Sequence, residues 1–145
     1  MFEVFYYARC GNGKSTCQNT VELAKAIAAE LGVMAEDIID NKNEPAKDAF
    51  IFLGCGCYGD KGGSKLSHFI AENNFKGRQV ALFGTSLTDT SNKLKRAEEL
   101  LKPAGAVIKG HFYCTRKSLP FLHKSRLSKE ELTSTREFVN EMKIS

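Results

Sequence analysis

Short apolar runs alternate along the chain with segments of helical spacing, and this alternation restricts the possible folds more than any other feature. Apolar runs occur at Phe2–Ala8, Ala49–Leu53, Gln79–Phe83 and Ala106–Tyr113, and a shorter one at Ile38–Ile39. The run Ala49–Leu53 is apolar at every position, as is typical of a central parallel strand with both faces buried. Strands that alternate with helices predict a parallel sheet covered by helices on both faces.

The intervening segments carry helix signals. Asn19 and Glu22 have the spacing of a capping box, and Gly32 is a suitable end for the helix that follows. Further helices are predicted at Lys65–Glu72, at Asn92–Leu101 and from Ser128 to about Met142. We therefore predict an α/β fold: a doubly wound, three-layer α-β-α sandwich around a five-stranded parallel sheet, in one domain covering residues 1–145.

The bulk composition narrows the function classes. The chain has 145 residues, is 42% hydrophobic and 26% charged, and carries a net charge of +4. No run approaches the about 18 apolar residues of a membrane span, no signal-peptide pattern opens the chain, and no basic–aromatic pattern typical of nucleic-acid binding occurs. These features predict a cytoplasmic protein without membrane or nucleic-acid partners. The mildly basic surface is first of all consistent with an ordinary solvated surface that has a slight excess of lysine. The alternative is a surface that favours an acidic protein partner or a phosphorylated ligand.

Three loops rich in small and polar residues follow predicted strands: Arg9–Gln18, Gly54–Ser64 and Gly84–Thr90. In an open α/β sheet, ligands bind at the carboxyl ends of the strands, where the strand order reverses. Because all three loops leave strands at that edge, they predict a ligand site there.

The first loop also satisfies a permissive form of the P-loop pattern, with Ala8 in place of the first glycine and Lys14-Ser15 at its end. Glycine-rich backbone would wrap a phosphate in such a loop, and the lysine would meet its charge. However, the predicted helix cap at Asn19 lies several residues downstream, and no later strand ends in an aspartate suited to Mg²⁺. A nucleotide-binding protein of the P-loop type is therefore an alternative rather than the main prediction.

The second loop and its surroundings resemble the flavodoxin family. The segment Asp48–Asp60, which reads DAFIFLGCGCYGD, is similar to the third strand and first flavin loop of flavodoxins. Leu66–Ile70 and Phe75–Thr85 continue the likeness, and the order of elements agrees over nearly the whole chain. The resemblance implies a flavodoxin-like fold, FMN as the cofactor, and electron transfer as the activity.

The resemblance also implies site residues. Phosphate binding would fall on the loop after the first strand and the start of its helix, with Arg9, Cys10, Gly11, Asn12, Gly13, Lys14, Ser15, Thr16, Asn19 and Thr20 as candidates. The first flavin loop would be Cys55, Gly56, Cys57, Tyr58, Gly59 and Asp60, where Tyr58 matches the aromatic residue that stacks on the flavin ring and Gly59 the peptide that turns toward flavin N5. Thr85 and Ser86 would line the other side of the ring.

The chain departs from the family pattern in its phosphate loop. The family motif Ser-x-Thr-Gly-Asn-Thr aligns either with Ala8–Gly13 or with Ser15–Thr20, and both alignments leave a loop longer than the family's. Lys14 would add a cation that the usual loop lacks. The loop Gly84–Thr90 has no aromatic residue, and Leu87, Phe112 or Tyr113 would have to cover that face of the ring.

Five cysteines form an odd set: Cys10, Cys17, Cys55, Cys57 and Cys114. In a reducing compartment they are expected to be free thiols. All five are predicted at or just past the carboxyl ends of strands, so a thiol redox centre or a metal site of Cys10, Cys55, Cys57 and Cys114 is the alternative. The close spacing of Cys55 and Cys57 is unlike the usual two-residue gap of metal knuckles, and we predict no metal.

The main prediction is an FMN-binding electron carrier that works with a redox partner protein and has no catalytic residues of its own. A small FMN-dependent reductase is the first alternative, with the irregular segment Thr115–Arg126 as its substrate or partner surface. A P-loop nucleotide-binding protein is the second. A flavodoxin fold that has lost its flavin and serves as an interaction module is the third.

Overall fold

A computed structural model describes residues 1–7, 9–10, 15–16, 18–38, 45–46, 48–55, 68–86, 98–115 and 129–144. The chain forms β1 (Phe2–Tyr7), a short pair β2 (Arg9–Cys10) and β3 (Ser15–Thr16), and α1 (Gln18–Leu31). It continues through β4 (Ala35–Asp37), β5 (Phe50–Cys55), β6 (Gln79–Ser86), β7 (Val107–Thr115) and α4 (Lys129–Ile144). Residues 68–72 and 98–101 are also helical.

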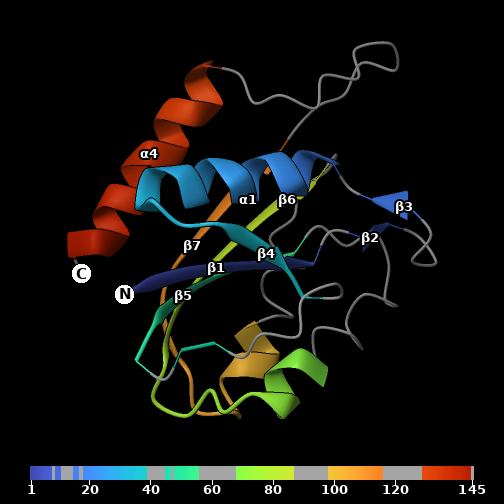
Figure 1. Cartoon of the computed structure of the whole chain (residues 1–145), viewed down its shortest axis with the longest axis vertical. Coiled ribbons are helices and arrows are strands. Elements are labelled where there is room, and N and C mark those ends of the chain that lie inside the picture. The colour runs from blue at the N-terminus through green and yellow to red at the C-terminus, as the bar shows by residue number, and fades with distance from the viewer. Residues whose placement is uncertain are drawn as a thin grey trace.

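The main sheet has five strands in the order β4-β1-β5-β6-β7, and every neighbouring pair is parallel. Figure 1 shows α1 and α4 above this sheet and the helical residues 68–72 and 98–101 below it. The predicted five-stranded parallel sheet between two helical layers is therefore confirmed.

The side chains of each strand point alternately to the two faces of the sheet, and this divides the core into two halves. On β1, β5 and β6, one set of buried side chains packs with Phe69, Ile70 and Leu101 of the lower layer. The other set packs with α1 and α4, through residues such as Leu23 and Val139. Successive side chains of a strand point to opposite faces, so a central strand must be apolar at every position.

The second strand was predicted in the wrong place. The sequence indicated Ile38–Ile39, whereas the structure has β4 at Ala35–Asp37, paired with Val4–Tyr6. The Ile38 N–H still donates to the Tyr6 carbonyl at 3.0 Å, but Ile39 lies outside the described residues. This edge strand is short and partly exposed, with Glu36 and Asp37 in it, and therefore lacks the apolar run used to find strands.

Other boundaries shift by a few residues. The helix predicted from Asn19 begins one residue earlier, and it ends at Gly32 as predicted. Gly32 has a φ of 72°, its N–H donates to the Ala29 carbonyl at 3.2 Å, and the Val33 N–H donates to the Ala28 carbonyl at 2.9 Å. This pair of bonds is a Schellman motif, which satisfies the last carbonyls of α1.

The outer strand β7 carries a bulge. Val80 pairs with Ile108 and Ala81 with Gly110, so Lys109 is an extra residue in β7. The bulge changes the facing of the residues that follow: Gly110 lies against Met142 of α4, and the His111 Nε2 lies 3.2 Å from Glu98 Oε1 on the other face. A bulge with a lysine also protects an edge strand against pairing with another chain.

The Arg78 side chain, just before β6, links its own turn to the segment Pro45–Ala46, which in turn contacts β1. Its guanidinium donates to the backbone carbonyls of Asn74, Ala46 and Pro45, and the Ala46 N–H donates to the Glu3 carboxylate at 3.0 Å. Replacing Arg78 with methionine keeps the aliphatic bulk but removes the donors from three carbonyls. We expect a loss of about 1–3 kcal/mol in the free energy of unfolding, measured with urea.

The control for this prediction is Arg136→Met. Arg136 makes an exposed ion pair with Glu30, at 3.0 Å, and exposed pairs contribute about 0–1 kcal/mol. Equal losses for the two variants would show that the Arg78 contacts do not contribute as the structure implies.

Candidate functional site

The strand order reverses at β1, with β4 on one side and β5 on the other. In parallel sheets of this kind a crevice opens beyond the carboxyl ends of the strands at the reversal. The register places Tyr7 beside Cys55 and Cys55 beside Gly84 in one row across the sheet. The first predicted loop follows Tyr7, and the second follows Cys55, which lies beside Tyr7 in this row. The third follows Ser86, two residues beyond Gly84, which lies in the same row.

The strands β6 and β7 extend past this row. Thr85 pairs with Cys114 and Ser86 with Thr115, beyond the pairing of Gly84 with Tyr113. The structure thus brings the predicted residues Cys55, Thr85 and Ser86 to one edge of the sheet. It adds the end of β7, where the sequence had suggested Phe112 or Tyr113 as a cover for the ring and had placed Cys114.

A β-hairpin interrupts the first loop. In the antiparallel pair β2–β3, Arg9 lies opposite Thr16 and Cys10 opposite Ser15, and Figure 1 shows this pair beyond the end of β1. The hairpin accounts for the extra length relative to the family motif. The Asn12-Gly13 dipeptide, a common hairpin turn sequence, was the signal that could have predicted it.

The hairpin argues against the P-loop alternative. In a P-loop the hydroxyl residue after the lysine opens the helix, but here Ser15 and Thr16 form β3 and α1 begins only at Gln18. The described residues Arg9–Cys10 and Ser15–Thr16 form an antiparallel pair, whereas the backbone of a P-loop wraps the phosphate and continues directly into a helix.

The start of α1 also lies at this edge. Among the predicted phosphate residues, Asn19 and Thr20 belong to the first turn of α1, and Thr20 is fully buried at 0% exposure. The first N–H groups of a helix have no partner within the helix, and they carry the positive end of its dipole. An anionic group held at this edge would therefore be stabilised by the helix.

Nine predicted site residues lie outside the described part of the chain. They are Gly11, Asn12, Gly13, Lys14, Gly56, Cys57, Tyr58, Gly59 and Asp60. The helix cap predicted at Ser128 and the segment after Thr115 lie outside it as well, as do Cys17 and Leu87.

The cysteines of β5 and β7 are separated by a whole strand. Cys55 pairs with Gly84 of β6, and Cys114 pairs with Thr85 of the same strand from the other side. Two spacings of about 4.8 Å place their backbones about 10 Å apart, beyond the about 7 Å that a disulfide can bridge. Within the described residues, no group of three His, Cys, Asp or Glu side chains is arranged to hold a metal ion.

Comparisons with known proteins agree with this architecture. No protein-family model matches the chain, and no curated protein sequence matches it. A short-chain flavodoxin associated with a PDU bacterial microcompartment is similar in structure, with a TM-score of 0.66, 14% sequence identity, and coverage of 97% of this chain and 95% of that one. A flavodoxin of Streptococcus pneumonia TIGR4 is similar with a TM-score of 0.67, 15% identity, and coverage of 97% and 98%.

These likenesses confirm the predicted flavodoxin-like fold over nearly the whole chain. In addition, no helix in the described part of the chain is both long and apolar enough to cross a bilayer.

Proposed function

We propose that this chain binds FMN at the carboxyl edge of its sheet and carries electrons to or from a partner protein. The observation that carries the proposal is the row in which Tyr7, Cys55 and Gly84 adjoin at the reversal of strand order. The loops that resemble flavin loops leave the sheet from this row. When bound, FMN would supply the redox chemistry, and the protein would supply binding, orientation and electrostatics.

The residues present fit a phosphorylated ligand. The start of a 14-residue helix lies at this edge, which provides unpaired N–H donors for a phosphate. Of the two alignments with the family's phosphate motif, the hairpin favours Ser15–Thr20, because this segment leads directly into α1 whereas Arg9 and Cys10 form the outgoing arm. We assign phosphate binding to that segment.

The remaining assignments follow the resemblance. Tyr58 would stack on the flavin ring, and Gly59 would present its peptide carbonyl to the ring edge. Thr85 and Ser86, the last residues of β6, would line the opposite side. Each of these residues would position the cofactor, and none is assigned a catalytic role.

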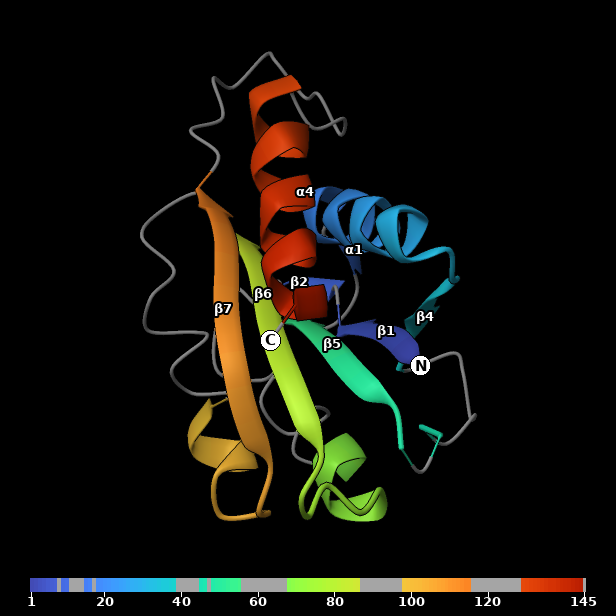
Figure 2. The same cartoon turned by 90° about the vertical axis from the view of Figure 1, so that its left-hand side faces the viewer.

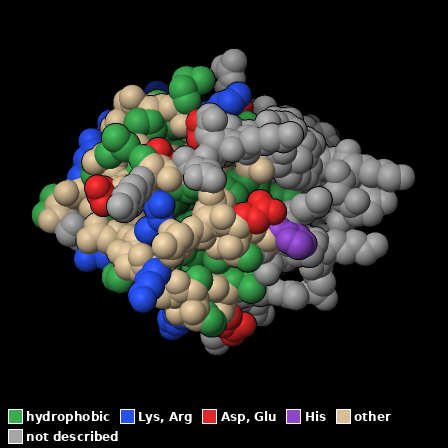
Figure 3. Space-filling view, turned by 60° about the horizontal axis from the view of Figure 1, so that its bottom comes forward, with side chains coloured by type: hydrophobic (Ala, Val, Ile, Leu, Met, Phe, Trp, Pro, Cys, Tyr) green, Lys and Arg blue, Asp and Glu red, His purple; other side chains and the backbone are tan. Residues whose placement is uncertain are grey.

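The partner is proposed to be acidic, because the chain carries a net charge of +4. Figure 3 views the side of the molecule that lies at the bottom of Figure 1, and there the basic and acidic side chains are interspersed among separate small hydrophobic areas. The described part of that face therefore offers no large patch of one charge or of apolar side chains. A partner is better accommodated at the proposed FMN edge, where electrons would leave.

Binding of FMN and of riboflavin, measured by visible absorption and fluorescence quenching, tests the proposal. We expect purified protein to retain one FMN after gel filtration, and to bind riboflavin about 100-fold more weakly because it lacks the phosphate. Thr16→Val is expected to weaken FMN binding but leave riboflavin binding unchanged, whereas Thr133→Val on α4 changes neither.

The outcomes separate the parts of the proposal. Protein that retains neither flavin would refute the assigned function. Equal affinity for FMN and riboflavin would retain flavin binding but refute the phosphate site at Ser15–Thr20.

A further inference from the structure

A polar pocket lies at the edge of the sheet opposite the proposed FMN site. It has a volume of about 480 Å³, and the residues around it include Asp48, Ala49, Asn74, Lys76, Arg78 and Gln79. Asp48 and Ala49 immediately precede β5, and Gln79 is the first residue of β6. Since these strands are parallel, the pocket is separated from Cys55 and Ser86 by the length of the strands. Its volume lies within the range of small-molecule sites.

Local hydrogen bonds hold one wall of the pocket in place. The Lys76 N–H donates to Asn74 Oδ1 at 3.1 Å, and the Arg78 N–H donates to the Phe75 carbonyl at 3.0 Å. Gly77 has a φ of 76°, and its N–H donates to the Gly105 carbonyl at 2.9 Å. This turn is therefore preformed, and a ligand would not have to order it.

Arg78 contributes a fixed positive charge. Its guanidinium is half-buried and donates to the carbonyls of Asn74, Ala46 and Pro45. An arginine has five N–H groups, so three donated bonds leave two. Within the described part of the chain, no carboxylate forms an ion pair with this side chain. A half-buried charge without a counter-ion favours an anionic group nearby.

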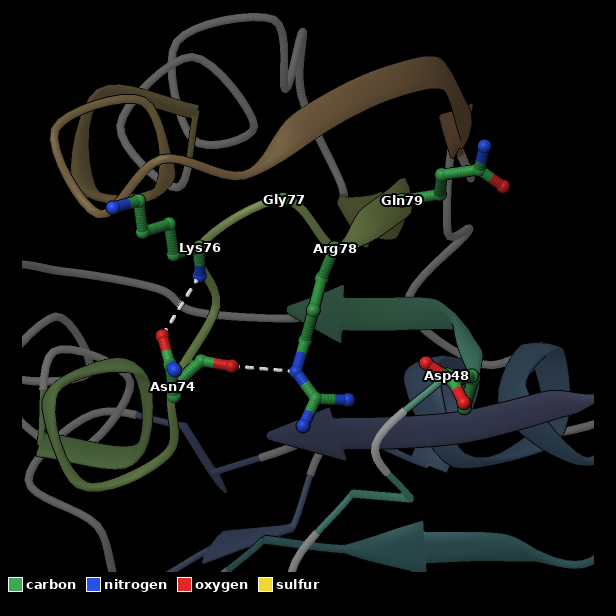
Figure 4. Close-up of a pocket in the computed structure, with 7 residues that line it drawn as sticks. Asp48, Asn74, Lys76, Gly77, Arg78 and Gln79 are labelled. Atoms are coloured by element: carbon green, nitrogen blue, oxygen red, sulfur yellow. Dashed lines mark hydrogen bonds between the residues drawn. The ribbon is translucent and has the colours of Figure 1, made fainter.

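Asp48 contributes the opposite charge. Figure 4 shows the guanidinium between Asn74 and Asp48, with no hydrogen bond to the Asp48 carboxylate, while the Lys76 side chain runs away from both. Among the described residues, nothing pairs with the Asp48 carboxylate. Gln79 borders the same pocket with a side-chain amide that can donate and accept. The pocket thus presents one fixed cation and one carboxylate that do not neutralise each other by direct contact.

We propose that this pocket binds a small zwitterion of the amino-acid class, with its carboxylate on Arg78 and its ammonium group on Asp48. A ligand with only a negative charge would be attracted by Arg78 but repelled by Asp48. A ligand with only a positive charge would be attracted by Asp48 but repelled by Arg78. A zwitterion satisfies both charges at once, and charge-assisted hydrogen bonds are the stronger kind.

Titration followed by ¹H–¹⁵N correlation spectra tests this site on the protein saturated with FMN, or on the protein as purified if it binds none. The probes are glycine, β-alanine and 4-aminobutanoate, in which the separation of the two charges increases. We expect at least one to cause saturable shifts in the amides of residues 48–49 and 74–79, with a dissociation constant of about 0.1–10 mM. Acetate and ethylammonium, each with one charge, are expected to bind at least about fivefold more weakly.

Asp48→Asn is expected to weaken binding of the best probe by about fivefold to tenfold, because the ammonium group loses its charged acceptor. The matched control is Glu141→Gln on α4, an exposed carboxylate away from the pocket, which should leave the affinity unchanged. Arg78 is not substituted because its guanidinium also holds the turn at Asn74 and the segment Pro45–Ala46 in place.

Shifts that fail to saturate for every probe would refute the site and leave a water-filled hollow. Acetate that binds as tightly as the zwitterions would refute the role of Asp48. Shifts confined to the amides of Gln18–Thr20 and Cys55 would place the probe at the FMN edge instead, which would also refute this pocket. Since the pocket lies at the other edge of the sheet, none of these outcomes depends on FMN binding.

Discussion

Replacing Phe138 with alanine is expected to lower the free energy of unfolding by about 3–5 kcal/mol, the range typical of a buried phenylalanine. Phe138 lies on α4 and is 6% exposed. Its ring is stacked on Phe112 of β7, with centroids 5.1 Å apart, and meets Phe52 of β5 edge-on at 5.9 Å. Figure 2 shows α4 lying along the face of the sheet between these strands. Loss of the ring would leave a cavity where the last helix contacts the sheet.

Urea unfolding measures this loss, and Leu132→Ala provides the control on the same helix. Leu132 is 41% exposed, so its truncation should change stability by no more than about 0.5 kcal/mol. Similar losses for the two variants would mean that α4 does not pack on the sheet through Phe138.

The central strands of the sheet could be predicted because their residues are packed against one helical layer or the other. Ile51, Phe52 and Leu53 are all buried, since a central strand faces a helical layer on each side. β4 lies at the edge of the sheet and has no such requirement. Its partly exposed residues, Ala35–Asp37, do not form an apolar run. The sequence pattern therefore indicated the first apolar pair downstream, Ile38–Ile39, instead.

The sequence predicts at which edge of the sheet the candidate site lies, but not which residues lie side by side in it. Parallel pairing brings the carboxyl ends of strands to one edge, so the sequence predicted correctly that the loops after three apolar runs begin at a common edge. That a ligand binds at this edge stays a prediction. The register between strands could not be predicted, because the length of each loop does not determine which residues lie side by side. The pairing of Cys55 with Gly84, and of Thr85 with Cys114, therefore came only from the structure.

The hairpin in the first loop shows a different reason for failure. The family motif has no strands and aligns with this segment in two ways, so it gives no indication of a hairpin. Two residues on each arm, Arg9–Cys10 and Ser15–Thr16, are too few to show the alternation by which strands are recognised. Turn residues were the stronger local signal here.

The second large effect is expected at Gly54, where an alanine should destabilise the protein by about 1–3 kcal/mol through overpacking. Gly54 pairs with Phe83 of β6, and a Cβ at this position would lie 2.2 Å from Phe83 Cε2. The Phe83 side chain is fully buried, at 0% exposure, so its ring cannot move without displacing its neighbours. Urea unfolding measures the loss.

Two further variants isolate the cause. Gly110→Ala would bring a Cβ within 2.8 Å of Met142 Cε, but that atom ends a flexible side chain, so the loss should be smaller. Adding Phe83→Leu to Gly54→Ala should recover part of the stability, because the smaller side chain leaves room for the methyl group. A double variant whose losses simply add would contradict a direct clash.

Gly54 also connects stability with the proposed function, because it immediately precedes Cys55, the last residue of β5. If about 1.4 kcal/mol of the strain reached the FMN edge, FMN affinity would fall about tenfold. Gly54→Ala is therefore expected to weaken FMN binding, whereas Gly110→Ala should not, since Gly110 pairs with Ala81, three positions before Gly84 in β6 and so farther from the FMN edge. Stability lost without any change in affinity would mean that the strain is absorbed on the Phe83 side and that β5 keeps its end in place.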